Sequence, residues 1–263
     1  MTKIKAIFIH SDHPSKSLSI SEIVDYLRDY GLCVHDRGNL IESLNLCEED
    51  SFELAASIAG IKVQDISTPL DAIFEPDFRE ANTELQRLKG KNSDRGVLYD
   101  GQWLQRMLYK IIAEKLIDEF NGGFIHMVFT SRLFGTFETK RYHARVILAG
   151  LPSLISTSGV VEAPARPKEY YWLKAGFLRS GKDISELDMA YRGKFIEYDD
   201  ERITQVLKSY ALQAVFYELA GKAFCDNPDC CLFNSHWQED VLRAQLNAKL
   251  CLEHRNIFDA RKD

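Results

Sequence analysis

The C-terminal part of the chain contains two short stretches, CDNPDCC at Cys225–Cys231 and CLEH at Cys251–His254. Four residues separate the first and second cysteines of the first stretch, and two residues separate the cysteine and histidine of the second. Zinc prefers four tetrahedral ligands drawn from thiolates and imidazoles, and proteins often supply them as two such pairs. The spacing therefore predicts a structural zinc site that staples the C-terminal helical segment, with the ligands Cys225, Cys230, Cys251 and His254.

Two neighbouring residues compete for places in this predicted site. Cys231 follows Cys230 directly and could replace it, and His236 is a spare imidazole. The alternative interpretation is a set of ordinary buried cysteines with an exposed histidine. Because Cys33 and Cys47 stand alone while the other cysteines crowd together near the C-terminus, the distribution favours metal binding over disulfides in a reducing compartment.

The composition indicates a folded protein and argues against several functional classes. The 263 residues are 45% hydrophobic and 27% charged, which is sufficient for a sizeable folded core. A net charge of −6 argues against a nucleic-acid-binding protein, whose surface usually has a basic face. No run approaches the roughly 18 apolar residues of a membrane helix, and the N-terminus lacks a signal-peptide pattern. A cytoplasmic protein with neither a membrane nor a nucleic acid as partner is expected.

Strand-like and helix-like patterns alternate along the chain. Apolar residues at helical spacing run from Ile203 to Leu219, and strand-like runs cover residues 124–129, 142–149 and 154–161. Residues 62–95 are polar and mixed, and we expect them to be connecting structure. The alternation predicts an α/β (α+β) fold with a mixed sheet flanked by helices.

The polar connecting stretch also indicates a domain boundary. Residues 1–95 are interpreted as an N-terminal α/β lobe, and residues 96–263 as the core that carries the C-terminal zinc site. A second interpretation makes residues 1–95 continuous with the core.

The C-terminal segment resembles that of archaemetzincins, a family of metallopeptidases. In that family a long helix carries H-E-x-x-H-x-x-G-x-x-H, and the last histidine directly precedes a C-x4-C…C-x2-C structural zinc site. Cys225 and Cys230 match the first pair, and Cys251 and His254 match the second, with histidine in place of the last cysteine. The resemblance implies a metzincin-like core and zinc as the cofactor.

Two blocks further upstream are similar to an archaeal family of unknown function that is catalogued as candidate metallopeptidases. The first is HMVFTSRLFGT at His126–Thr136, continued by RYHAR at Arg141–Arg145. The second is ISTSGVVEAPARPKEYY at Ile155–Tyr171. The likeness extends from the first predicted strand to the end, and it implies a soluble archaeal member of that family.

The helix before the zinc spacing lacks the catalytic ligands of the archaemetzincin pattern. Counting back from Cys225, the three histidine positions hold Phe224, Glu218 and Ala214, and the glutamate position holds Val215. The mechanism requires two histidines one helical turn apart on one ion and a glutamate as general base. We therefore expect a degenerate, inactive HExxH-type helix.

Three side chains remain as weak catalytic candidates: Glu218, His143 and Glu162. His143 lies between arginines in the RYHAR stretch and could bind a metal together with His126. The alternative interpretation of His143 is a strand residue satisfied by hydrogen bonds, and that of Glu162 is an ion-pair partner of an arginine.

These patterns leave three functional hypotheses. The first is a zinc metallopeptidase-family protein that keeps the structural zinc, has lost catalysis, and binds a peptide or protein. The second is an active metallohydrolase that uses a non-standard ligand set around His143. The third is a non-enzymatic, zinc-stabilised binding module. A second bound metal ion per chain would distinguish the second hypothesis from the other two.

Overall fold

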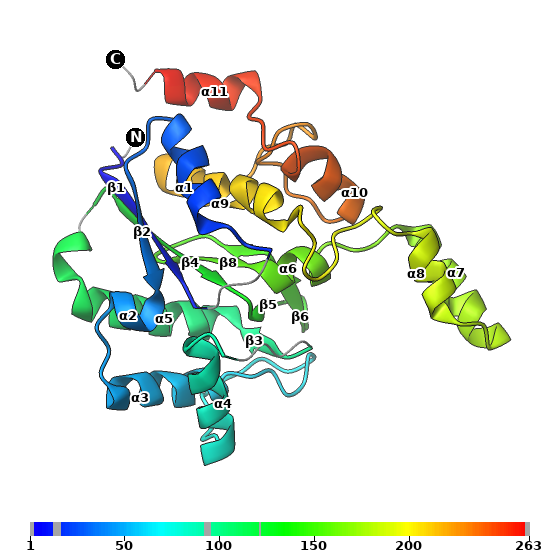
Figure 1. Ribbon diagram of the computed structural model, residues 1–263, viewed down its shortest axis with the longest axis horizontal. Helices are drawn as coiled ribbons and strands as arrows, with labels where there is room; N and C mark the ends of the chain where they lie inside the picture. The colour runs from blue at the N-terminus through cyan, green and yellow to red at the C-terminus, as the bar shows by residue number, and fades with distance from the viewer. Residues whose placement is uncertain (1–2, 13–16, 92–95, 121, 261–263) are drawn as a thin grey trace.

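A five-stranded sheet forms the centre of the fold (Figure 1). The computed structural model describes residues 3–12, 17–91, 96–120 and 122–260. The strand order is β2-β1-β4-β8-β7; β2, β1, β4 and β8 run parallel, and β7 pairs antiparallel with β8. The strands are β1 (Ala6–Ser11), β2 (Val34–Asn39), β4 (Phe124–Thr130), β7 (Ile147–Leu148) and β8 (Ser153–Ser156).

Helices cover both faces of this sheet (Figure 1). Since side chains alternate along a strand, Ile7 and Ile9 of β1 point into the core under α1 and α9. Val128 of β4 and Leu154 of β8 point to the opposite core, under α3 and α5. The helices are α1 (Ile20–Asp29) and α9 (Ile203–Ala220) on one face, and α2 (Leu40–Ser43), α3 (Glu48–Ala59), α4 (Phe78–Leu88) and α5 (Gly101–Lys115) on the other.

A smaller sheet of β3 (Leu98–Asp100), β5 (Leu133–Glu138) and β6 (Arg141–Arg145) lies beside the main one. The sequence pattern predicts one strand over residues 154–161. The prediction is wrong after Ser156, because the strand ends there and α6 (Thr157–Glu162) begins. Ser156 caps this helix, because its side chain accepts a 2.8 Å hydrogen bond from the amide of Gly159. A Cβ atom on Gly159 would lie 2.3 Å from the carbonyl oxygen of Arg145, so glycine permits α6 to pack directly on that backbone.

The expectation of connecting structure over residues 62–95 is wrong for α4. This helix begins with a complete capping box, in which Asp77 accepts from the amide of Glu80 and Glu80 accepts from the amide of Asp77. Its buried face includes two charged residues, Glu84 and Arg87. Apolar residues are few in this helix and occupy only part of its buried face, so they do not reveal the helix in the sequence by themselves.

The predicted α/β class with mixed sheets flanked by helices is confirmed. The division at residue 95 stays a prediction; β1, from the range before it, pairs directly with β4, from the range after it. In the described residues, no helix has both the length and the apolar character needed to cross a membrane.

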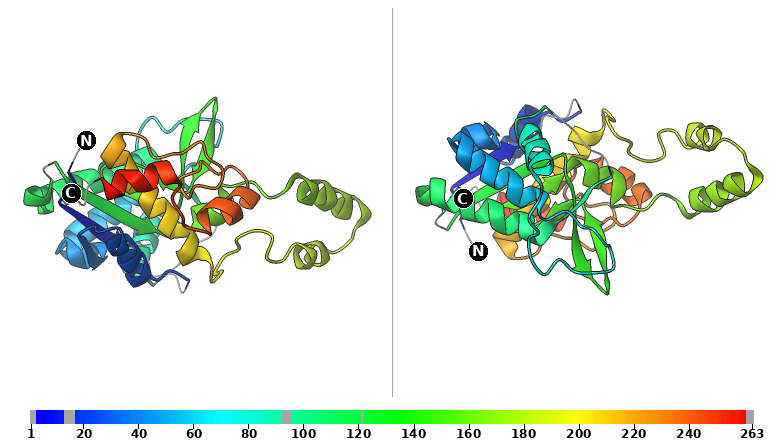
Figure 2. Two further views of the ribbon diagram at one scale, coloured as in Figure 1. Left: turned by 90° about the horizontal axis from the view of Figure 1, so that it is seen from above. Right: turned by 90° about the horizontal axis from the view of Figure 1, so that it is seen from below.

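Two helices, α7 (Lys168–Ser180) and α8 (Ile184–Ala190), project from the body as a hairpin (Figures 1 and 2). The chain then returns to α9, and the C-terminal region follows it as a loop with short helical segments. These segments are α10 (Gln238–Asp240), a π-helical turn (Val241–Gln245) and α11 (Leu252–Asp259).

Candidate metal centre and the cavity beside it

The loop after α9 carries the first pair of predicted ligands. The helix ends at Gly221, which adopts the left-handed conformation (φ 68°) common after the last helical turn. The Cys225 amide then donates to the carbonyl of Leu232 at 2.9 Å, and the Cys230 amide to that of Asn227 at 3.1 Å. The loop between the two cysteines thus folds into a knuckle that holds both thiols on one side.

The second pair lies at the start of α11. Cys251 is the residue before the helix, and His254 follows one helical turn later. The Cys251 amide donates a 3.4 Å hydrogen bond to Cys230 Sγ, and the ring of Phe216 in α9 meets the His254 ring edge-on at 5.0 Å. Contacts with both the knuckle and α9 therefore orient the second pair toward the first.

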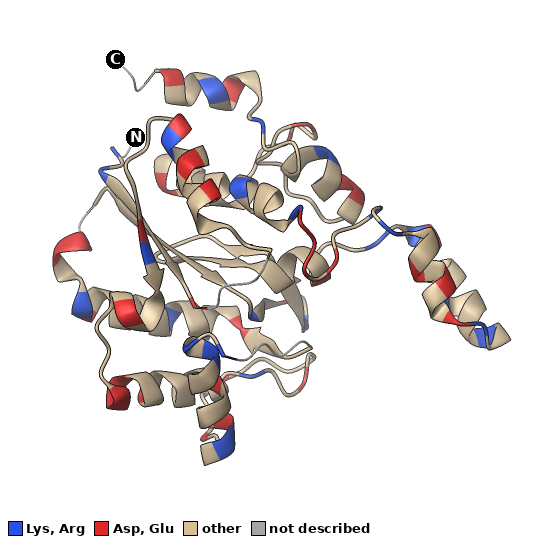
Figure 3. Ribbon diagram, in the orientation of Figure 1, with Lys and Arg blue, Asp and Glu red and all other residues tan. Residues whose placement is uncertain are grey.

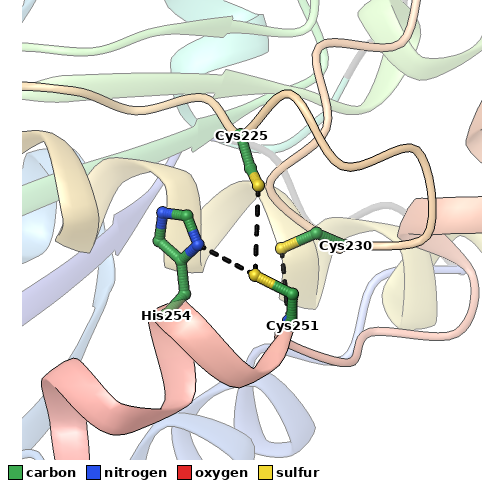
Figure 4. Close-up of side chains that lie close together, drawn as sticks. All are labelled: Cys225, Cys230, Cys251 and His254. Carbon is green, nitrogen blue, oxygen red and sulfur yellow. Dashed lines mark hydrogen bonds between the residues drawn. The ribbon is translucent and has the colours of Figure 1, made fainter.

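The four side chains converge on one point (Figure 4). The Sγ atoms of Cys225 and Cys251 are 4.0 Å apart, and Cys251 Sγ is 3.1 Å from His254 Nδ1. One donor atom from each of the four residues lies within 4.8 Å of every other. Zinc–sulfur bonds of about 2.3 Å in a tetrahedron place sulfur atoms roughly 3.8 Å apart. The donor set and its spacing fit a tetrahedral zinc ion.

The thiols of this group differ in their readiness to ionise. A hydrogen bond from the Cys231 thiol, helped by the amides of Cys251 and Leu232, lowers the pKa of Cys230 to about 5 against the opposing effect of burial. Burial raises the pKa of Cys225 to about 12. The group thus holds at least one ready thiolate, and a cation would favour ionisation of the remaining thiols.

On the other side of the knuckle, a small cavity of about 70 Å³ lies between α9, the segment around β7 and the C-terminal loop. Gln213 of α9 is fully buried in its wall. Its Nε2 donates to the carbonyls of Cys231 and Phe233, each at 3.4 Å, whereas its Oε1 has no hydrogen-bond partner among the described residues. The other polar side chains in the lining are Arg145, Tyr210, Asn234, Ser235 and His236.

A more open groove of about 440 Å³ adjoins this cavity, and Arg145, Ile147, Phe224 and Asn234 line both. Tyr217 of α9 forms one wall of the groove, and Ile147 and Leu148 of β7 form another. The apolar pattern of α9 is typical of a core helix and did not point to this region. The available signal was three polar side chains on one helical face, at Tyr210, Gln213 and Tyr217.

The Probable metallopeptidase family (DUF6775) has a family model that matches residues 3–261 of the chain. The chain belongs to this family. The family resemblance predicted from the two upstream blocks is therefore confirmed. A comparison with curated proteins finds no match.

Two solved structures resemble this family member at low sequence identity. A zinc-dependent peptidase from Methanocorpusculum labreanum is 10% identical, with a TM-score of 0.46 and coverage of 96% of this chain and 99% of that one. An archaemetzincin from Methanopyrus kandleri is 12% identical, with a TM-score of 0.39 and coverage of 99% and 96%.

Neither of the two competing ligands belongs to the four-residue group, although the Cys231 thiol hydrogen-bonds to Cys230, and the choice of ligands stays a prediction. Cys231 and His236 both lie outside it in the part of the chain that the structure describes. The Cys231 amide donates to the carbonyl of Lys249 at 2.8 Å, which ties the knuckle to the segment before Cys251. His236 is exposed and lines the cavity instead.

The three catalytic candidates lie on different elements. His143 in β6 lies 3.5 Å from the hydroxyl of Thr139, and Glu162 at the end of α6 accepts a 3.0 Å hydrogen bond from Tyr198. Glu218 in α9 is half-buried, and burial raises its pKa. Among the described residues, none of the three belongs to a group of three or more side chains placed to hold a metal.

His126 and Arg132, from the first family block, also have other contacts. His126 Nδ1 lies 3.3 Å from His10 Nε2, and the two buried rings stack. Arg132 forms ion pairs with Asp12 and Glu84. These side chains thus form separate buried groups within the fold.

Proposed function

We propose that this family member is a zinc-stabilised protein that binds an extended peptide segment without hydrolysing it. The buried Gln213 Oε1 carries the proposal, because it is an acceptor without a partner among the described residues and lies in the wall of a cavity that borders an edge strand. A buried polar atom left unpaired typically costs about 1–3 kcal/mol. An N–H group that enters the cavity would recover that cost.

Zinc in this proposal has a structural role. The ligands would be Cys225, Cys230, Cys251 and His254, which supply all four tetrahedral positions and leave none open for a substrate or a water molecule. A closed site of this kind contributes folding free energy and does no chemistry. It would hold α11 against α9 and keep the cavity wall in place.

The absence of hydrolysis is supported by the part of α9 where archaemetzincins carry their catalytic ligands. Ala214 and Val215 are fully buried among apolar neighbours, and neither side chain can bind a metal or transfer a proton. Burial raises the pKa of Glu218, so its carboxyl ionises less readily than that of an exposed glutamate. The polar residues of α9 that line the cavity are instead Tyr210 and Gln213.

The peptide class follows from the shape of the site. β7 stands at the edge of the main sheet, and an edge strand can pair with an added extended chain. The adjoining groove offers apolar and aromatic walls, formed by Ile147, Leu148, Tyr217 and Phe224. Main-chain pairing would supply affinity, and the N–H that reaches Gln213 would fix the register.

The test combines metal analysis with peptide binding. We expect elemental analysis of the purified full chain to give one zinc per chain. Fluorescence anisotropy with a pool of labelled casein peptides should show binding, and mass spectrometry of the same mixture should show intact peptides. Tyr217→Ala should weaken binding at least tenfold, whereas Tyr109→Ala, a matched exposed tyrosine on α5, should not change it.

Any of three results would overturn the proposal. Cleavage of the peptides that stops when zinc is removed would show an active hydrolase. A second metal ion that is lost in a folded His143→Ala variant would place that activity at the non-standard ligand set. Equal binding by the Tyr217→Ala and Tyr109→Ala variants would show that the groove is not the peptide site.

A further inference from the structure

The projecting hairpin of α7 and α8, residues 168–190, is a second surface with unexplained features; we call it the arm. The two helices pack against each other, and the arm extends well beyond the body in all three views (Figures 1 and 2). Among the described residues, the apolar cluster at the arm has three buried members, Tyr170 and Leu187 of the arm and Phe195 of the returning segment. So small a cluster leaves most of the apolar surface of the arm uncovered.

The base of the arm is nevertheless held firmly by the buried side chain of Gln238. Its Nε2 donates to the carbonyl of Val160 at 2.8 Å, and its Oε1 accepts from the amide of Ile196 at 2.9 Å. Its backbone amide also donates to the carbonyl of Ala165 at 2.8 Å. One residue therefore ties both connecting segments, the one that leads into the arm and the one that returns from it, to the body. This fixes the direction in which the arm projects.

Large apolar side chains are exposed along the arm. Trp172 is 81% exposed, Met189 67% and Leu178 60%. On α7, Tyr171, Trp172, Ala175 and Leu178 follow the i, i+1, i+4, i+7 spacing of a single helical face, and all four are exposed. Isolated exposed apolar residues are common, but a continuous stripe on a projecting helix marks an interaction surface.

Charges on the arm are separated between its two helices (Figure 3). α7 carries Lys168, Lys174, Arg179 and Glu169, which gives +3 − 1 = +2, and α8 carries Glu186 and Asp188, which gives −2. With Lys182 and Asp183 in the connection, the whole arm has four basic and four acidic residues and is neutral. Because the chain carries −6 in total, the rest of it carries −6 − 0 = −6.

We propose that the arm binds the arm of a second copy of this chain about a two-fold axis. A two-fold interface requires a self-complementary surface. Antiparallel arms would place each basic α7 against the acidic α8 of the other copy, with the apolar stripe buried between them. Since the arms are neutral and project outward, they also allow contact while the two acidic bodies stay apart.

The test is the mass of the full chain in solution, measured by sedimentation equilibrium over a range of concentrations. We expect twice the 30.1 kDa chain mass. A variant with Trp172→Glu and Leu178→Glu should dissociate at least tenfold more readily. The matched control is Ile117→Glu, a 74% exposed apolar residue outside the arm, which should leave the mass doubled. Circular dichroism checks that each variant is folded.

A mixing experiment tests the antiparallel pairing itself. Arg179→Glu and Glu186→Lys should each weaken self-association, because each places like charges opposite one another. Mixing the two variants should restore dimers, since both contacts in the mixed pair are then attractive. The proposal would be overturned if the native chain is monomeric at every concentration. It would also be overturned if Trp172→Glu and Leu178→Glu leave the dimer as stable as that of the native chain. If the mixture of the two variants dimerises no more strongly than either variant alone, the pairing of α7 with α8 is overturned.

Discussion

The two faces of the main sheet bury their polar groups in different ways. On the side of α4, Arg132 is 2% exposed and lies between Asp12 and Glu84. The Arg132 guanidinium donates to Glu84 Oε2 at 2.9 Å, and the Asp12 carboxylate also accepts a 2.6 Å hydrogen bond from Thr130. Each charge in this group meets an opposite charge from the protein itself.

On the side of α9 the polar groups of interest are two buried thiols, a half-buried thiol and imidazole, and a buried amide oxygen. Cys225, Cys230, Cys251 and His254 are good ligands for a cation, and Gln213 Oε1 is an acceptor without a partner among the described residues. The comparison teaches that burial of polar groups alone does not indicate function. A polar group whose partner must come from a bound ion or ligand is the better candidate for a binding site.

The largest expected effect comes from removing a ligand of the metal group. Cys251→Ser should lower the free energy of unfolding by about 5 kcal/mol or more, because structural zinc contributes roughly 10–16 kcal/mol of apparent binding free energy. Urea unfolding and elemental analysis would measure the loss of stability and of zinc together. Cys33→Ser, which changes an exposed cysteine outside the group, is the control and should leave both unchanged. Full stability of Cys251→Ser would refute a structural zinc.

On the α4 side of the sheet, breaking the buried ion pairs should lower the free energy of unfolding without changing the zinc content. Arg132→Met leaves Asp12 and Glu84 buried without their guanidinium, which typically costs about 3–5 kcal/mol. The half-exposed pair of Arg145 and Glu138 is the control, and Arg145→Met should cost about 1 kcal/mol or less. Loss of zinc from a folded Arg132→Met protein would show that the two faces are coupled and not independent.

Acid should lower the stability of the fold through two buried histidines, His10 and His126. Burial, aided by His126 and Arg37, lowers the pKa of His10 to about 3, and burial lowers the pKa of His126 to about 4. The unfolded chain, with histidine pKa values near 6.5, therefore binds more protons. Stability should be complete above pH 6.5 and decline as the pH falls toward 4, by about 2 kcal/mol per histidine at pH 5.

Unfolding curves of the native chain and of His126→Phe between pH 7 and pH 5 would measure this loss. The variant should lose stability less steeply with acid, since one of the two proton-binding groups is gone. His236→Gln, which removes an exposed histidine, should follow the native curve. If the His126→Phe curve has the native slope, the pair does not remain neutral in the folded protein.

The smallest expected effect on stability is at the cavity. Gln213→Met should cost only about 1 kcal/mol, because Gln245 Nε2 also donates to the carbonyls of Cys231 and Phe233, at 3.3 and 2.7 Å. Peptide binding should nevertheless fall at least tenfold, since the acceptor is lost. The metal group should keep its zinc. An unchanged anisotropy titration would remove Gln213 from the proposed site.

Much of the α9 side could be predicted from the sequence because its signals are local. The spacing of Cys225 and Cys230, and of Cys251 and His254, is set by turn geometry within a few residues, and the structure brings these four side chains together. The alternation of strands and helices likewise depends on periodicity within each segment. The expectation that Ala214 and Val215 replace archaemetzincin ligands also came from the sequence, and it stays a prediction.

Only the tertiary structure decided the rest. The helical character of residues 78–88 was hidden because Glu84 and Arg87 are buried against charges that come from elsewhere in the chain. The cavity depends on Gln213 meeting carbonyls of the knuckle, and the exposure of the arm depends on both its ends being tied to Gln238. Local spacing determines which residues can act together within a turn, but contacts across the chain decide which polar groups find partners and which remain open to a ligand.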